Sequence, residues 1–156
     1  MRRGSASSEP SERPTLVRRG ILMKRPVGFF GSDTCRVLLL WVDRIEWYDP
    51  AFSEHKGFGA GYNGPGLKGD MLLQPDSRVE YYSDARELKI TTSDRQLVLY
   101  PHDVSNGAAA SKDIYDWAVA INDVVHRDNA GRRQKLMQIF QKDGQELRVE
   151  RSVVRR

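Results

Sequence analysis

Seven short apolar runs, spread between residues 17 and 100 and separated by turn residues, restrict this chain to a mainly β fold. Stretches such as RELKIT and RQLVLY alternate apolar and polar residues, which is typical of strands with one buried face and one solvated face. The later connections PD, SDA and SD are short and rich in turn formers, so an antiparallel sheet is expected. The predicted strands span residues 17–25, 35–42, 44–49, 69–74, 77–82, 87–92 and 95–100.

A single long helix is predicted after the last strand. Ser111 is the expected N-cap, and Asp113 would lie in the first turn, where a carboxylate favours the positive end of a helix. Apolar residues then recur at helical spacing and form one stripe, which consists of Ile114, Trp117, Ala118, Ile121, Val124 and Val125. Burial of this stripe would close one open end of the sheet.

The composition, 39% hydrophobic and 29% charged, suits one folded domain with tails. We expect the domain at residues 16–127, a disordered tail at 1–15, and a basic extension at 128–156 that is partly helical or disordered. Within the domain, residues 51–69 contain six glycines, which predicts a long loop that is either functional or mobile.

Cysteine usage and apolar segments suggest a cytoplasmic location. Cys35 is the one cysteine and cannot form an internal disulfide, which fits a reducing compartment. No apolar run reaches the roughly 18 residues that a membrane span requires, and no apolar segment follows the arginines at the N-terminus.

The net charge of +4 is unevenly distributed along the chain. Residues 1–19 hold five arginines and two glutamates, and residues 128–156 hold eight basic and four acidic residues, so residues 20–127 carry a net charge of −3. A mildly acidic centre argues against a domain that coats nucleic acid over a wide face. It is compatible with a small, focused anion site, since no carboxylate lies between Glu12 and Asp33.

Several short motifs stand in a characteristic order. The first strand reads G-x-L-x-K at Gly20 to Lys24, the second R-x-L-x-L at Arg36 to Leu40, the third RIEWYDP and the fourth KGDMLL, and Trp117 lies in the helix. In this order and spacing, the chain resembles the pleckstrin homology family over about residues 17–127. The resemblance implies a seven-stranded antiparallel sandwich or partly open barrel, with four strands and then three in nearly orthogonal sheets, capped by the helix.

The resemblance also implies where a ligand binds. In phosphoinositide-binding members, basic residues at the end of the first strand, at the start of the second and before the fourth-strand glycine surround the headgroup. Lys24, Arg36 and Lys68 occupy these positions, and Arg25 could join them from the loop. Thr34 stands where members often have a second basic residue. Convergent lysine and arginine side chains on rigid strands are the chemistry that a phosphorylated headgroup requires.

Two further segments carry interaction hypotheses. Phe29 and Phe30, in the first loop, would insert into a membrane interface or fold back beneath the loop. Residues 132–142 place Leu136, Ile139 and Phe140 on one side of a helix, with Arg132, Arg133 and Lys135 nearby. This segment would extend the helix, face a membrane, or dock on a partner protein.

The sequence lacks the patterns of an enzyme or a metal site. His55, His102 and His126 have no metal-ligand spacing, and GFGAG lacks the Lys and Ser or Thr of a phosphate loop, so no catalytic residue, metal or other cofactor is expected. The favoured interpretation is a non-catalytic adaptor that binds phosphoinositide or another anionic lipid. The alternatives are a protein-interaction scaffold with little lipid binding and a scaffold that assembles through its C-terminal segment.

Overall fold

The computed structural model describes residues 13–26, 30–129, 135–140 and 146–152. Within these ranges the chain forms nine strands, one long helix and two short 3-10 turns, and the seven predicted strands all occur in the predicted order. The predicted tail at 1–15 lies outside the described residues up to position 12. The elements are β1 (Leu16–Lys24), β2 (Thr34–Trp41), β3 (Arg44–Tyr48), a 3-10 turn (Pro50–Phe52), β4 (Leu67–Leu72), β5 (Arg78–Tyr82), β6 (Glu87–Thr91), β7 (Gln96–Pro101), α1 (Gly107–Val125), a 3-10 turn (Arg127–Asn129), β8 (Lys135–Phe140) and β9 (Glu146–Ser152).

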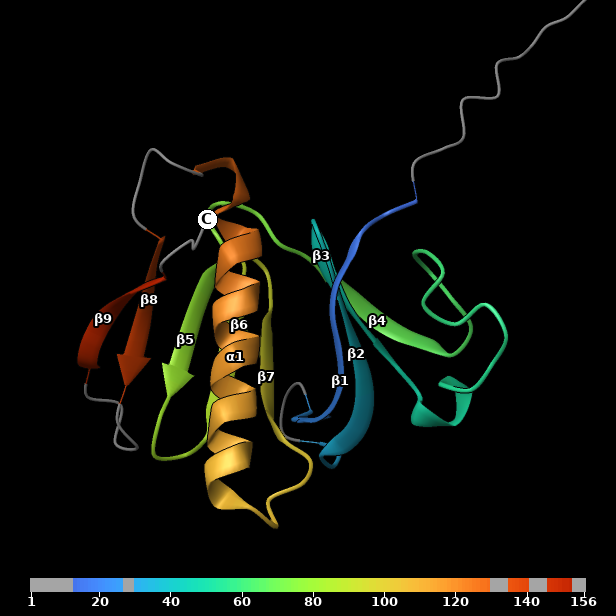
Figure 1. Ribbon diagram of the computed structural model, residues 1–156, viewed down its shortest axis with the longest axis horizontal. Coiled ribbons are helices and arrows are strands. Elements are labelled where there is room, and N and C mark those ends of the chain that lie inside the picture. The colour runs from blue at the N-terminus through green and yellow to red at the C-terminus, as the bar shows by residue number, and fades with distance from the viewer. Residues whose placement is uncertain (1–12, 27–29, 130–134, 141–145, 153–156) are drawn as a thin grey trace, which may run out of the picture.

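The strands form one hydrogen-bonded sheet in the order β4-β3-β2-β1-β7-β6-β5-β8-β9. β1 pairs with β2 along its length and with β7 only through Leu22, Met23 and Lys24, so it joins two groups of strands. In Figure 1, α1 lies over β5, β6 and β7, while β2, β3 and β4 lie on the other side of β1. This is the expected mainly β fold capped by a helix.

The helix buries the predicted stripe, but it begins earlier than predicted. All six apolar residues of the stripe are buried in the main core. The N-cap is Asn106, whose side-chain oxygen accepts a hydrogen bond of 3.1 Å from the Ala109 amide, and Ser111 lies inside the helix. The asparagine cap and the three alanines that come after Gly107 explain the earlier start, because alanine is the best helix former. Asn122, which is not one of the six apolar residues, is also buried, at 2% exposure.

The helical prediction for residues 132–142 is wrong for the part that the structure describes. Residues 135–140 form β8, which pairs parallel to β5 and antiparallel to β9. Met137 and Ile139 alternate into the core at 2% and 1% exposure, and Phe140 stacks on Tyr82 with ring centroids 5.1 Å apart. The unpaired edge of β5 offers backbone hydrogen-bond partners to this segment. The alternative, a helix of three turns, is only marginally stable alone, so the strand is favoured.

Burial removes Ile139 from the set of residues that were expected to contact a membrane or partner. Its neighbour Phe140 is half-buried against Tyr82, while Arg132 and Arg133 lie outside the described residues. Lys135 and Leu136 belong to β8, where their backbones pair with Ser152 and Arg151.

The glycine-rich stretch between β3 and β4 packs against the sheet. Phe58, Tyr62 and Leu67 cover a second apolar cluster on β2 and β3, which consists of Val37, Leu39, Trp41 and Tyr48. This cluster lies on the face of the sheet opposite the main core, because successive strand residues point to opposite faces. The loop therefore acts as a cover for β2 and β3.

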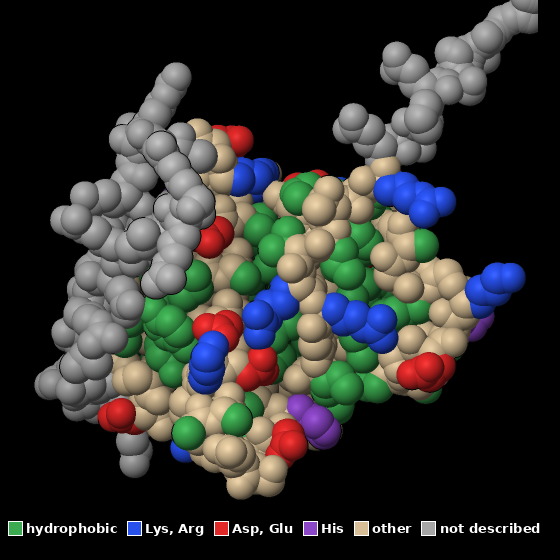
Figure 2. All heavy atoms as spheres, in the orientation of Figure 1, with side chains coloured by type: hydrophobic (Ala, Val, Ile, Leu, Met, Phe, Trp, Pro, Cys, Tyr) green, Lys and Arg blue, Asp and Glu red, His purple; other side chains and the backbone are tan. Residues whose placement is uncertain are grey.

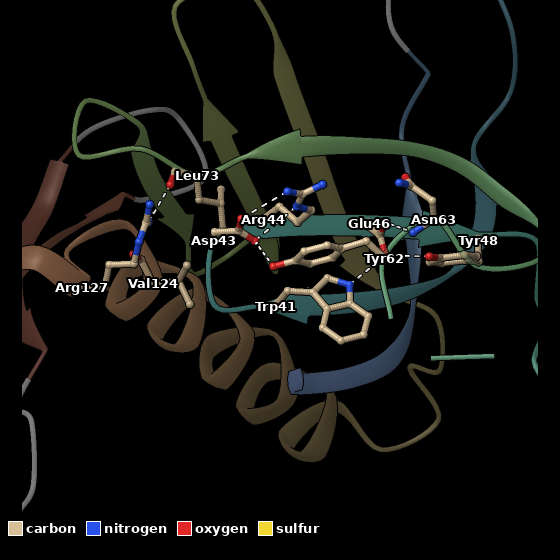
Figure 3. Close-up of polar contacts among 10 residues, drawn as sticks. All are labelled: Trp41, Asp43, Arg44, Glu46, Tyr48, Tyr62, Asn63, Leu73, Val124 and Arg127. Carbon is tan, nitrogen blue, oxygen red and sulfur yellow. Dashed lines mark hydrogen bonds and ion pairs between the residues drawn. The ribbon is translucent and has the colours of Figure 1, made fainter. Parts of the chain in front are cut away.

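A buried carboxylate fixes this cover (Figure 3). Glu46 is 0% exposed and accepts hydrogen bonds from Trp41 Nε1 at 2.7 Å, the Tyr48 hydroxyl at 2.6 Å and the Asn63 amide at 2.9 Å. The Tyr48 hydroxyl in turn accepts from the Gly64 amide at 3.0 Å. Burial, more than the hydrogen bond to Glu46, raises the pKa of Tyr48 well above its usual range.

We expect Glu46→Ala to lower the free energy of unfolding by about 3 kcal/mol or more, because it leaves the buried Trp41 and Tyr48 donors and the Asn63 amide without their acceptor. Urea denaturation of the full chain measures this change. Glu54→Ala, in the exposed part of the same loop, is the control and should change stability by less than about 0.5 kcal/mol. Equal effects of the two substitutions would contradict the proposed role of Glu46.

Ile139→Ala is expected to destabilise the chain by about 3 kcal/mol, because it leaves a cavity in the core. The control is Leu72→Ala, which removes as many carbon atoms as Ile139→Ala but from a side chain that is 52% exposed, and it should cost much less. Thermal or chemical denaturation compares the two. A loss below about 1 kcal/mol for Ile139→Ala would show that β8 does not contribute to the core in solution.

Candidate anion-binding site

Lys24 and Arg36 meet at the margin of the main core. Leu22 is fully buried, and Lys24 follows it by two residues on the same face of β1. Arg36 pairs with Leu22 across the β1–β2 ladder and precedes the buried Leu38 by two residues. Both basic side chains therefore lie on the core-facing sides of their strands, just beyond the last buried apolar residue of each.

Trp47 and Arg95 complete this cluster. The Lys24 ammonium lies 5.5 Å and the Arg95 guanidinium 5.6 Å from the centroid of the Trp47 ring. A hollow of about 250 Å³ is lined by Lys24, Trp47 and Arg95 together with Gln96 and Leu97. Gly69 leaves room for Trp47, because a Cβ at that position would lie 2.5 Å from ring atoms.

The sequence interpretation missed Arg95. It stands just before β7, far along the chain from the first loop, and it donates a hydrogen bond to the Asp70 carbonyl. Its position beside Lys24 depends on the pairing of β7 with the end of β1. No local motif marks that contact, although a basic residue in the turn before the last strand would have been a reasonable candidate.

The charges of the cluster repel one another. Burial lowers the pKa of Lys24, and the positive charges of Arg36 and Arg95 lower that pKa further. Arg36 Nη1 donates to the Cys35 carbonyl at 3.1 Å, while Arg36 Nε is buried and has no hydrogen-bond partner among the described residues. A bound anion would relieve the repulsion and could accept from the arginine.

Arg25 lies outside this cluster. It donates to carboxylate oxygens of Glu87 and Asp33, the latter at 3.2 Å, and its guanidinium lies 4.6 Å from the Tyr100 ring centroid. The hydrogen bond to Glu87 is the main cause that raises the pKa of Arg25. The carboxylates of Glu87 and Asp33 thus balance the charge of Arg25. Its side chain points to the side of the sheet opposite Lys24, because successive residues alternate.

The remaining predicted site residues, Lys68, Thr34 and Phe30, do not line the hollow. Lys68 is exposed on β4, next to the register shift opposite Trp47 and Tyr48. Thr34 is half-buried and pairs with Lys24 across the ladder. Phe30 is 92% exposed, and Phe29 lies outside the described residues.

The surface charge has no single broad basic face in the view of Figure 2, where Lys and Arg side chains alternate with Asp and Glu side chains over the described part of the molecule. This agrees with a localised anion site. Among the described residues, no group of three or more His, Cys, Asp or Glu side chains could hold a metal ion. Of the helices in the described ranges, none has the length and apolar character needed to cross a bilayer.

Comparison with known proteins identifies the fold of this chain through similar solved structures. No protein-family model matches the sequence, and no curated protein matches it either. Among solved structures, the crystal structure of the C-terminal PH domain of pleckstrin is similar at 18% identity and a TM-score of 0.53, over 71% of this chain and 98% of that one. The same domain in complex with D-myo-Ins(1,2,3,5,6)P5 is similar at 20% identity and a TM-score of 0.52, over 71% and 96% of the two chains.

A third similar structure is the solution structure of the C-terminal PH domain of human pleckstrin, at 18% identity and a TM-score of 0.53, over 80% of this chain and 92% of that one. The shared part contains an antiparallel sheet with a C-terminal helix against it, as the motifs of the first four strands and Trp117 imply. The chain therefore has the fold of a pleckstrin homology domain.

Proposed function

We propose that this chain is a non-catalytic module that binds the phosphorylated headgroup of an anionic membrane lipid, in particular a phosphoinositide. The observation that carries the proposal is the convergence of Lys24, Arg36 and Arg95 beside a hollow of about 250 Å³, where burial and then the two arginine charges lower the pKa of the lysine. Three mutually repelling cations at the margin of a core are destabilising unless a ligand uses them.

The chemistry of such a headgroup fits this arrangement. A bisphosphorylated inositol carries several negative charges, and charge-assisted hydrogen bonds from lysine and arginine are among the strongest in proteins. Trp47 provides a rigid apolar wall for the hollow, and Lys68 could reach a phosphate from β4. The pleckstrin PH domain that shares this fold binds an inositol pentakisphosphate, which supports the proposal by analogy of fold.

Membrane attachment would combine three weak contributions. The headgroup contacts are the first, and the basic segments at residues 1–19 and 128–156 add attraction of about 1 kcal/mol per basic residue near an anionic surface. Phe30, and in this proposal also Phe29, would insert beside the headgroup. The protein would then work in the cytoplasm, peripherally bound to a membrane.

A groove next to the helix favours the second candidate function, which is peptide binding. It has a volume of about 430 Å³ and lies between β1, the end of β7 and the first turns of α1. Its lining includes Ile21, which is 48% exposed, as well as Pro101 and Ala109. Here the chain would be a protein-interaction scaffold with little or no lipid binding.

Co-sedimentation with vesicles separates these functions. Phosphatidylcholine vesicles with a bisphosphorylated phosphoinositide are compared with vesicles of equal charge that contain phosphatidylserine. We expect preferential binding to the phosphoinositide and a loss of about tenfold or more in Lys24→Ala/Arg36→Ala, because charge-assisted bonds are removed. Lys56→Ala/Lys112→Ala removes two lysines at exposed positions elsewhere and is the matched control.

Other outcomes identify the alternatives. Equal binding by both double mutants, lost at high salt, would assign membrane attachment to the basic segments and refute the headgroup site. Absence of binding by the unmodified protein to either vesicle would favour the peptide-binding scaffold.

Headgroup binding should also raise the pKa of Lys24. In the free protein this pKa is lowered by burial, Arg36 and Arg95, and a bound phosphate favours the charged ammonium form. NMR titration of the Lys24 side chain, with and without a soluble inositol bisphosphate, measures the shift. Arg95→Gln should raise the pKa of Lys24 in the free protein, while Lys56→Ala/Lys112→Ala should leave the ligand-induced rise intact. A Lys24 pKa that does not respond to the headgroup would argue against direct contact.

A further inference from the structure

A second hollow lies where the C-terminal half of α1 meets β8 and the start of β5. Its volume is about 250 Å³, and residues of the turn before β5 complete its wall. It shares no lining residue with the hollow at Lys24. Gln138 from β8 is part of its lining, so the strand added beyond the seven helps to form it.

Asn122 is the unusual residue of this hollow. It is 2% exposed, it lines the hollow from α1, and its Nδ2 atom has no hydrogen-bond partner within the described part of the chain. A buried donor without an acceptor costs about 1 to 3 kcal/mol. Asparagine is also a poor residue for a helix interior. Because the described part of the chain offers no acceptor to this Nδ2 atom, the atom is available to donate to a ligand.

Ser77 supplies a second donor. It is 5% exposed, and its Oγ accepts a hydrogen bond of 3.0 Å from the Gln74 amide, which leaves the hydroxyl proton to donate elsewhere. The exposed Arg78 and Asp76 bring one positive and one negative charge to the lining. The interior of the hollow is therefore rich in donors, and its charged residues cancel.

We infer that this hollow binds a single carboxylate group, with Asn122 Nδ2 and the Ser77 hydroxyl as its hydrogen-bond donors. A carboxylate offers two acceptor oxygens and one negative charge, which two neutral donors and a nearby Arg78 can satisfy. A phosphate dianion would need more cations than Arg78 provides against Asp76. The carboxylate belongs either to a small free acid or to an acidic side chain of a partner protein.

NMR on the full chain tests this inference through the side-chain amide signals of Asn122. Sodium acetate represents the free acid, N-acetyl-glutamate α-amide represents an acidic side chain, and inorganic phosphate is the comparison anion. We expect saturable shifts of the Asn122 amide with both carboxylates and none with phosphate. If the glutamate derivative binds more tightly than acetate, the ligand is an acidic side chain of a partner protein. If acetate binds equally or more tightly, the ligand is a small acid.

Two substitutions at Asn122 distinguish a ligand site from a buried donor that has no ligand. Asn122→Asp keeps the shape, repels a carboxylate and should abolish the shifts seen at neighbouring backbone amides. Asn122→Ala should weaken carboxylate binding about tenfold or more, and it should lower the melting temperature less than other buried polar-to-alanine changes do, since Nδ2 has no partner to lose among the described residues. Lys24→Ala/Arg36→Ala should bind the carboxylates normally, which keeps this result independent of lipid binding.

Three results would overturn the inference. The first is an Asn122 side-chain amide whose chemical shift does not change with acetate or with the glutamate derivative. The second is equal carboxylate binding by Asn122→Asp and the unmodified chain. The third is a response to phosphate that is stronger than the response to either carboxylate.

Discussion

The double pairing of β1 is the constraint on which the rest of the structure depends. A long antiparallel ladder joins it to β2, and three residues at its end, Leu22 to Lys24, join it to β7. The two groups of strands thereby share one core, in which Leu22 is fully buried. Because side chains alternate along β1, the same strand that carries Leu22 into the core carries Lys24 to its margin. The candidate site is thus a direct continuation of the core.

Close approach of the helix to β1 gives a physical meaning to the first motif. A Cβ at Gly20 would lie 3.0 Å from the ring of Trp117, which is tighter than ordinary contact. Arg18, two residues earlier, lies 5.0 Å from the centroid of that ring and pairs with Asp113 at 2.8 Å. Glycine in the G-x-L-x-K pattern therefore admits the helix tryptophan, and the lysine at its end remains available at the edge of the core.

Local patterns explain which parts of the fold could be predicted. Short apolar runs bounded by turn residues identified all seven strands of the domain, and the stripe around Trp117 identified the helix, because both patterns depend on burial of near neighbours. The family resemblance named Lys24 and Arg36 as site residues, and the pairing of β1 with β2 that brings them together is also local. Arg95 and β8 could not be predicted in this way, since Arg95 reaches the site through β7 and β8 pairs with a strand more than fifty residues earlier.

Residues 135–140 show why such a segment is ambiguous. KLMQIF contains four apolar residues in six, so it satisfies a helical stripe and a strand with one buried face almost equally well. The free edge of β5 decides between them, because pairing satisfies backbone groups on both strands at once. The added strand changes the surface as well as the sheet. Its residue Gln138 lines the hollow in which the Asn122 Nδ2 atom has no partner among the described residues, so a feature outside the seven-stranded domain contributes to the proposed carboxylate site.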